Sequence, residues 1–176
     1  MKSNCQKEIE VPKVFGFAGF SGVGKTTLIE KLLPILIGKG IRVSVIKHAH
    51  HDFDIDIPGK DSYRHRAAGA HEVLITANKR WVLMHELRNE VEPTLEEQLG
   101  RLSPCDLVIV EGFKRVEFPK IEIWREANGK PMLYPQDPNI VAVACDAEID
   151  CKGLPLLPLN HPVTIAEFIV KRFLND

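Results

Sequence analysis

The chain has 176 residues, 44% of them hydrophobic, and a formal net charge of −1, which suits one globular domain with a sizeable core over residues 1–176. The near-zero charge gives no electrostatic sign of binding to nucleic acid or to an anionic membrane surface. Residues 1–13 lack the apolar region of a signal peptide, and no apolar run approaches the roughly 20 residues that cross a bilayer, so we expect a cytoplasmic protein with a flexible N-terminal extension over residues 1–12.

Apolar runs and turn residues predict the elements in chain order. Strands are expected at Val14–Ala18, Ile41–Lys47, Val73–Thr76, Trp81–His85, Asp106–Val110, Ile121–Trp124 and Ile140–Ala144. Helices are expected at Lys25–Ile37, from Asp61 or Ser62 to Ala68, at Thr94–Leu102 and at Val163–Leu174, with Thr94 as one cap and Asn160 or Thr164 as another. Pro34 should kink the first helix or end it early.

A glycine-rich motif joins the first strand to the first helix, and it reads Gly19-Phe20-Ser21-Gly22-Val23-Gly24-Lys25-Thr26-Thr27. Its glycines let the backbone approach a phosphate, and its amides with the helix N-terminus form an anion-binding nest. Lys25 can reach the β- and γ-phosphates, and the Thr26 hydroxyl can ligate magnesium. The strand before and the helix after the motif make it a specific prediction of a nucleoside triphosphate site.

Glu111 follows the apolar run 107–110 and precedes Gly112. This is the position of the acidic residue that holds magnesium at the end of a Walker B strand, although most P-loop proteins carry Asp there. Asp106 begins the same strand and should lie near its other end, about 15 Å away by strand rise. We therefore expect Glu111, and not Asp106, to be the magnesium ligand.

The alternation of strands with helices predicts the fold class. We expect a three-layer P-loop NTPase fold of the α/β class, in which helices flank a mostly parallel twisted sheet and the hairpin 73–85 is an antiparallel addition. The run 107–110 is typical of a central strand buried on both faces. Trp81 and Trp124 are expected in the core more than at an interface. The four cysteines include no C-x-x-C pair and should be free thiols.

The segment 48–62 is rich in histidine and aspartate. If it is extended, five ionisable side chains share one face, namely His48, His50, Asp52, Asp54 and Asp56. The apolar side chains of Phe53, Ile55 and Ile57 would then pack on the body of the protein. Three interpretations stay open: a switch-like loop that completes the magnesium and γ-phosphate site, a separate transition-metal site, or a solvated loop without a ligand. The crowding of titratable groups favours a ligand.

Together these motifs resemble the MobB family. The resemblance covers Gly19 to Thr27, the signature from Lys47 through Pro58-Gly59-Lys60-Asp61-Ser62-Tyr63, Gly69-Ala70, Val110-Glu111-Gly112-Phe113-Lys114 and the run Ile140 to Asp146. It extends over most of the chain, from about Val14 to Leu174, and the histidine- and aspartate-rich signature is its discriminating part.

The resemblance implies a GTP- and Mg²⁺-binding adaptor in molybdenum cofactor biosynthesis. Such adaptors assist the partner enzyme MobA, which joins GMP to molybdopterin, and they are dimers with weak GTPase activity. On the matching positions, Gly22 to Thr27 would hold the phosphates and Glu111 would be the Walker B acid. The stretch 52–56 would lie at the nucleotide site, with Asp52 as a catalytic candidate beside Lys25 and with Asp54 as a further metal ligand.

One departure concerns the base. Asn78-Lys79-Arg80 is followed by Trp81, so the guanine-reading Asn-Lys-x-Asp motif is incomplete and falls in the predicted hairpin. Guanine preference therefore rests on the resemblance, and Asp146 is the candidate base contact. No glutamine or arginine stands in a recognisable catalytic position, which predicts slow hydrolysis by the chain alone. The alternative functions are a P-loop small-molecule kinase and a metal-delivery GTPase that uses the histidine-rich face.

Overall fold

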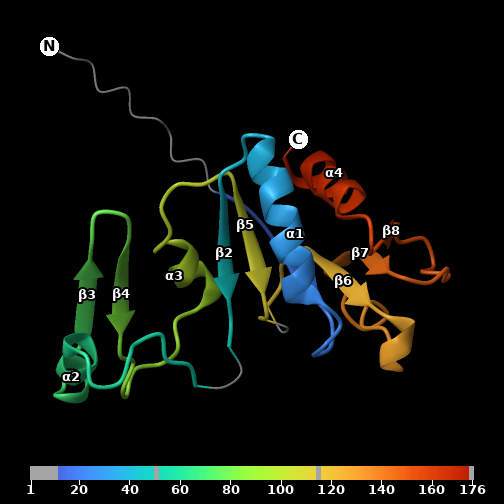
Figure 1. Cartoon of the computed structure of the whole chain (residues 1–176). Coiled ribbons are helices and arrows are strands. Elements are labelled where there is room, and N and C mark those ends of the chain that lie inside the picture. Colours follow the sequence, from blue (N-terminus) through green and yellow to red (C-terminus); the bar gives the residue numbers. More distant parts are fainter. Residues whose placement is uncertain (1–11, 50–51, 114–115, 175–176) are drawn as a thin grey trace, which may run out of the picture. The chain divides into compact units, whose positions relative to one another are not determined.

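The computed structural model describes residues 12–49, 52–113 and 116–174. Its contacts group the chain into two compact units (Figure 1), a larger one of Met1–His48 with Arg101–Asp176 and a smaller one of Ala49–Gly100. The expected N-terminal extension falls outside the described residues except for Pro12. The single domain over residues 1–176 stays a prediction, because this grouping rests on contacts and not on independent folding.

A parallel six-stranded sheet forms the centre of the larger unit. Its strand order is β2-β5-β1-β6-β7-β8, and every neighbouring pair is parallel. The strands are β1 Lys13–Ala18, β2 Val43–Lys47, β5 Leu107–Glu111, β6 Lys120–Trp124, β7 Ile140–Cys145 and β8 Leu156–Pro158. Among the strands of the described residues, the short β8 alone was not predicted. The α/β class with a mostly parallel sheet is confirmed.

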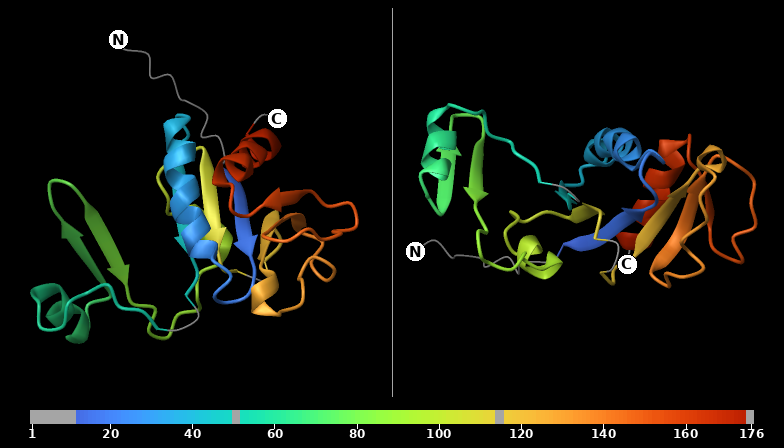
Figure 2. Two further views of the ribbon diagram at one scale, coloured as in Figure 1. Left: turned by 45° about the vertical axis from the view of Figure 1, so that its right-hand side comes forward. Right: turned by 90° about the horizontal axis from the view of Figure 1, so that it is seen from below.

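Two helices, α1 Lys25–Gly38 and α4 Pro162–Phe173, pack together on one face of this sheet (Figures 1 and 2). Leu32 and Leu36 of α1 and Ile169 of α4 are fully buried against strand residues such as Phe15. Each such side chain contributes about 1.5–3 kcal/mol through removal of apolar surface from water. In the order β2-β5-β1-β6, the chain passes from β1 to β2 on one side of β1 and later adds β6 on its other side. Parallel sheets bind ligands at the carboxyl ends of the strands where the strand order reverses in this way.

The ends of these helices correct two expectations. Helix α1 continues through Pro34 to Gly38 and stops where Gly40 adopts a φ of 83°, so the predicted early end at Pro34 is wrong, and the alternative of a kink there stays a prediction. The predicted side-chain caps of α4 are wrong, because its N-cap is His161, which makes no capping side-chain bond. Pro162 instead occupies the first turn, where a missing N–H leaves no donor unsatisfied. Among the described residues, no helix is both long and apolar enough to cross a membrane.

The smaller unit holds the predicted hairpin. Strands β3 Glu72–Thr76 and β4 Trp81–His85 pair antiparallel, and helix α2 Asp61–Ala67 contacts β3. Helix α3 Leu95–Leu99 ends earlier than predicted but begins as predicted, with a capping box in which Thr94 Oγ1 accepts from the amide of Glu97 at 3.2 Å. The core prediction is wrong for Trp81, which is 66% exposed, whereas Trp124 is half-buried and donates to the Lys130 carbonyl.

The aspartate-rich segment is not the expected half-buried strand. Phe53, Ile55 and Ile57 are 76%, 62% and 63% exposed, so the prediction that they pack on the body is wrong. Asp54 Oδ1 accepts from the Asp56 amide at 2.8 Å, and Asp56 Oδ1 accepts from the Ile57 amide at 3.0 Å. Such local side-chain bonds compete with the bonds of a strand ladder. His50 and His51 lie outside the described residues.

Arg66 of α2 fastens this segment within the smaller unit. Its guanidinium pairs with Asp54 at 2.7 Å, with Asp56 at 3.4 Å and with Glu86 at 2.8 Å. Ser62 donates to Asp56 Oδ1 at 2.8 Å instead of capping α2, and the N-cap is Lys60, so neither predicted cap residue serves as one. The hydrogen bonds to Glu86 and Asp54 raise the pKa of Arg66.

Asp106 precedes β5 at the end opposite Glu111 and binds Arg42. Arg42 Nη2 lies 2.6 Å from Asp106 Oδ1, and the Arg42 amide donates to Asp106 Oδ2 at 2.7 Å. These bonds lower the pKa of Asp106 from 3.8 to about 2. A carboxyl with a lowered pKa stabilises the fold above its unfolded pKa, and that contribution is lost as the pH falls through the folded value.

We therefore expect Asp106→Asn to lower the free energy of unfolding at neutral pH by about 1 kcal/mol or less, because the pair is open to solvent. The difference from the parent should shrink between pH 4 and pH 2, the interval between the unfolded and folded pKa values. Urea unfolding across this pH range measures it. A difference that is constant with pH would contradict the assignment, and nucleotide binding should not change.

Candidate functional site

The loop from Gly19 to Gly24 joins β1 to α1 in a conformation that requires glycine. Gly19, Gly22 and Gly24 have φ values of 145°, 82° and 97°, which L side chains rarely adopt. A Cβ on Gly19 would lie 2.6 Å from the Ile123 carbonyl oxygen, so the loop also packs tightly on β6. A Cβ on Gly22 would meet no atom within 4 Å, because it would project into open space. The loop thus forms an open cradle.

The N-terminus of α1 faces this cradle, and no acidic side chain of its own first turn competes for its amides. Gly24 is the N-cap and offers no side chain, and the first turn contains no Asp or Glu. The first amides and the helix dipole therefore favour an anion. Ser21 and Thr27 are exposed, whereas Val23 is buried in the core and can offer only its backbone. These features fit the phosphates of a nucleotide.

Lys25 and Thr26 extend from the first turn of α1. Lys25 Nζ donates to the carbonyls of Gly19 at 3.0 Å and Phe20 at 2.9 Å, which holds the ammonium group over the loop. Thr26 Oγ1 donates to Glu111 Oε1 at 2.9 Å. Two neighbouring ligands of an octahedral Mg²⁺ are about 3 Å apart when each lies 2.0–2.1 Å from the ion. Thr26 and Glu111 therefore fit a magnesium site.

Glu111 is positioned by strands on both sides of β5. It is the register partner of Phe17 in β1 and of Lys47 in β2. Its side chain is 13% exposed, and Lys47 Nζ lies 3.7 Å from Oε2. The Glu111 carbonyl accepts from the His48 amide at 2.8 Å, and a Cβ on Gly112 would lie 2.8 Å from the Cβ of His48. Gly112 therefore permits the close approach of His48.

Arg125 is a residue of this site that the sequence reasoning missed. Its Nε donates to the Val23 carbonyl at 3.0 Å, and its Nη1 lies 2.8 Å from Asp146 Oδ2. Asp146 Oδ1 also accepts from the Glu126 amide at 3.3 Å. Burial raises the pKa of Asp146, but the bonds from Arg125 and the Glu126 amide outweigh it and lower the pKa overall. The chain thus places a guanidinium beside the phosphate loop.

The remaining site candidates belong to the smaller unit. Asp52 is exposed, and Asp54 pairs with Arg66. Their roles in catalysis and magnesium binding stay predictions. Lys114 of the resemblance lies outside the described residues. The structure brings Lys25, Thr26 and Glu111 together as expected, and it also places Arg125 beside Asp146.

Comparison with known proteins identifies the family of this arrangement. The family model described as MobB, molybdopterin guanine dinucleotide synthesis protein B, matches residues 14–146. This chain belongs to the MobB family. A relative from Escherichia coli K12, named molybdopterin-guanine dinucleotide biosynthesis adapter protein, is 42% identical over 90% of this chain and 91% of its own. A relative of the same name from Haemophilus influenzae is 43% identical over 89% and 86% of the two chains.

Solved MobB structures share the fold. A crystal structure of molybdopterin-guanine biosynthesis protein B matches with a TM-score of 0.66 and 29% identity, and covers 90% of this chain and 97% of that one. Bacillus subtilis MobB matches with a TM-score of 0.74 at 24% identity over 93% and 99% of the two chains. The MobB family-model match ends at Asp146, the partner of Arg125, so both residues of this ion pair lie within it.

Asp146→Asn separates two possible roles of this residue at the candidate nucleotide site. If Asp146 holds Arg125 in place, the substitution weakens GTP and ATP binding alike, by about tenfold for the loss of one charge-assisted bond. If Asp146 reads the guanine base, GTP affinity falls and ATP affinity does not. We expect the first pattern, and calorimetric titration with both nucleotides measures it. Arg125→Gln should reproduce it, and a selective loss of GTP binding would contradict it.

Proposed function

We propose that this chain is a GTP- and Mg²⁺-binding adaptor in molybdopterin guanine dinucleotide biosynthesis. The observation that carries the proposal is the 2.9 Å contact of the Thr26 hydroxyl with the Glu111 carboxylate beside the glycine cradle. It occurs in a chain 42% identical to an Escherichia coli protein named as an adapter of this pathway. A magnesium ligand pair beside an anion cradle supports a triphosphate ligand.

The proposed division of labour follows the geometry. The loop amides and Lys25 neutralise phosphate charge, since Lys25 Nζ is already held over the loop by two carbonyls. Thr26 and Glu111 ligate the magnesium ion, and Asp54 is the further ligand that the sequence predicts. Bound magnesium bridges phosphate oxygens and screens their charge. The proposal of GTP over ATP rests on the guanine dinucleotide named in the relatives' pathway.

Slow hydrolysis is part of the proposal. Arg125 uses its Nε on the Val23 carbonyl and its Nη1 on Asp146. A guanidinium committed to the loop in this way supports binding more than attack on the γ-phosphate. Arginines supplied by a partner can accelerate such enzymes by several powers of ten. We therefore propose a weak GTPase whose turnover rises only with its partner.

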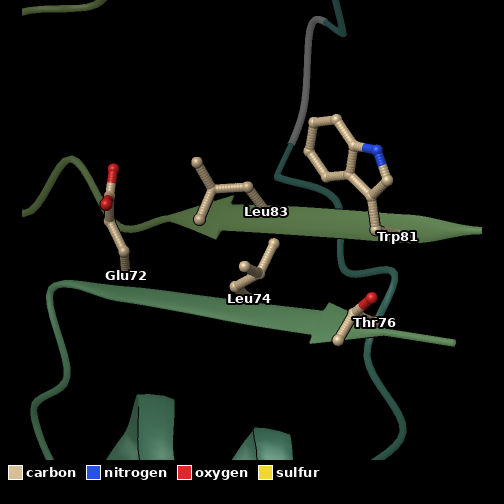
Figure 3. Close-up of a pocket in the computed structure, with 5 residues that line it drawn as sticks. All are labelled: Glu72, Leu74, Thr76, Trp81 and Leu83. Atoms are coloured by element: carbon tan, nitrogen blue, oxygen red, sulfur yellow. The ribbon is translucent and has the colours of Figure 1, made fainter.

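The proposed partners are the guanylyltransferase MobA, molybdopterin and a second copy of this chain, all in the cytoplasm. The hairpin supports a homodimer. Leu74, Leu83 and Trp81 stand on one face of it and are 60%, 46% and 66% exposed (Figure 3). With Glu72 and Thr76 they line a hollow of about 740 Å³. A two-stranded sheet is marginal alone, and a second copy would cover this apolar face.

Capture of the partner enzyme tests the proposal. Immobilised full-length chain is exposed to purified MobA with GTP and Mg²⁺, with GDP and Mg²⁺, or without nucleotide. We expect stronger retention with GTP and Mg²⁺, and loss of that difference in Glu111→Gln, which keeps the shape of the side chain but not its charge. Equal absence of MobA in all conditions would overturn the adaptor role. Glu167→Gln on the exposed side of α4 is the matched control.

A further inference from the structure

Three possible metal ligands meet at the base of the hairpin, within the smaller unit. His71 Nε2 lies 3.7 Å from Glu90 Oε1, and His85 Nε2 lies 3.1 Å from Glu90 Oε2. One donor atom from each of the three residues lies within 4.8 Å of the other two. The rings of His71 and His85 are 4.5 Å apart. One carboxylate is thus shared by two imidazoles.

Three backbone segments hold these three side chains in place. His71 precedes β3 and is tied to the end of β4, since the Glu86 amide donates to the His71 carbonyl at 3.1 Å. His85 ends β4 and is the register partner of Glu72. Glu90 is presented by a turn in which Arg88 has a φ of 50°, a conformation that costs energy in a residue other than glycine. Arg88 Nη2 donates to the Ala70 carbonyl at 3.0 Å, next to His71.

A second carboxylate orients one of the imidazoles. Glu72 Oε1 lies 2.8 Å from His85 Nδ1, which directs the Nε2 of His85 toward Glu90. A metal-binding histidine almost always donates its other ring nitrogen to a carboxylate or carbonyl in this way. The side chain of His85 is 19% exposed, whereas those of His71 and Glu90 are 61% and 51% exposed, so an ion can enter from solvent.

We propose that His71, His85 and Glu90 bind a divalent cation of the zinc type, with Glu72 as the orienting carboxylate. Zinc takes imidazole nitrogen and carboxylate oxygen at 2.0–2.2 Å, which puts two tetrahedral ligands about 3.3 Å apart. The distances of 3.1 and 3.7 Å bracket that value. Two imidazoles and one carboxylate favour zinc or a neighbouring first-row metal over magnesium or calcium. The fourth position is left for water or for a donor from another molecule.

This proposal does not depend on the proposed adaptor function, and its test uses the metal alone. Full-length chain treated with a chelator is titrated with Zn²⁺ by calorimetry. We expect His71→Ala and Glu90→Gln to lower the zinc affinity by about 10-fold or more. Glu72→Gln should lower it by about 10- to 100-fold, the typical cost of losing an orienting partner. His65→Ala, on an exposed position of α2 in the same unit, is the matched control and should bind as the parent does.

Nuclear magnetic resonance of the parent chain keeps the test independent of how the variants fold. Zinc should shift the Nε2 resonances of His71 and His85 at one equivalent, and the imidazole of His65 should not respond. Unchanged zinc affinity in folded His71→Ala and Glu90→Gln would overturn the site. So would shifts confined to other histidines. If these variants keep the GTP binding of the parent, their loss of zinc affinity arises at this metal site and not from damage to the phosphate loop.

Discussion

Lys25→Ala is expected to lower GTP affinity by about 100-fold or more. Lys25 Nζ lies over the loop through the carbonyls of Gly19 and Phe20, where a bound β- or γ-phosphate would receive its charge. A hydrogen bond to a charged group is worth about 1.5–3 kcal/mol, and 2.7 kcal/mol corresponds to a factor of about 100 in affinity. Calorimetric titration with GTP in the presence of Mg²⁺ measures the change.

A matched lysine separates the site effect from a general loss of positive charge. Lys31 lies on the same helix and is exposed, so Lys31→Ala should bind GTP as the parent does. The two variants carry the same net charge. If Lys25→Ala retains parental GTP affinity while its circular dichroism is unchanged, the phosphate loop is not the nucleotide site. A parallel loss in both variants would mean that long-range charge, and not this contact, governs binding.

Glu122→Ala should destabilise the sheet of the larger unit strongly for a polar position. Glu122 lies in β6, is 1% exposed, and accepts from the amides of Leu133 at 2.7 Å and Tyr134 at 2.8 Å. Burial raises the pKa of Glu122, and the hydrogen bonds that the two amides donate to its carboxylate oppose this shift without cancelling it. Removal of the carboxylate leaves both amides without this acceptor, and we expect a loss of about 3 kcal/mol in the free energy of unfolding.

Urea unfolding of Glu122→Ala against the parent measures this loss. Glu167→Ala on the exposed side of α4 is the control and should change the free energy of unfolding by less than about 0.5 kcal/mol. Glu122→Gln should fall between the two, because it retains one acceptor oxygen. A loss in Glu122→Ala no larger than that in the control would mean that the loop 130–137 does not depend on this carboxylate.

The sequence was most informative where the relevant signal is local. The glycines of the loop, the apolar run 107–110 and the position of Glu111 at its end are contiguous patterns, and their physical reasons act over a few residues. The sheet could be predicted because alternating strands and helices leave few ways to bury apolar faces. The cap at Thr94 was predictable because its capping box with Glu97 is also a local pattern, with the two residues only three positions apart.

Contacts between distant residues were not predictable in this way. Arg125 and Asp146 meet because β6 and β7 are neighbours, with Trp124 paired to Cys145, and no spacing in the chain marks that pairing. His71, His85 and Glu90 likewise come together through the turn and the register of the hairpin. The aspartate-rich segment failed as a strand because its carboxylates bind nearby amides and Arg66, which a pattern of alternation cannot show.

The two buried charges of β6 have a consequence for Arg125. Glu122 accepts from the amides of Leu133 and Tyr134, and Lys120 Nζ lies 2.9 Å from Asp137. These contacts hold the segment 133–137, which follows Arg125 in the chain, against β6. The entropy lost in ordering that segment is therefore lost when the chain folds, and not when a ligand arrives. Preorganisation of this kind raises affinity without adding a contact. Weakening the Lys120–Asp137 pair should therefore lower GTP affinity while the phosphate loop itself stays intact.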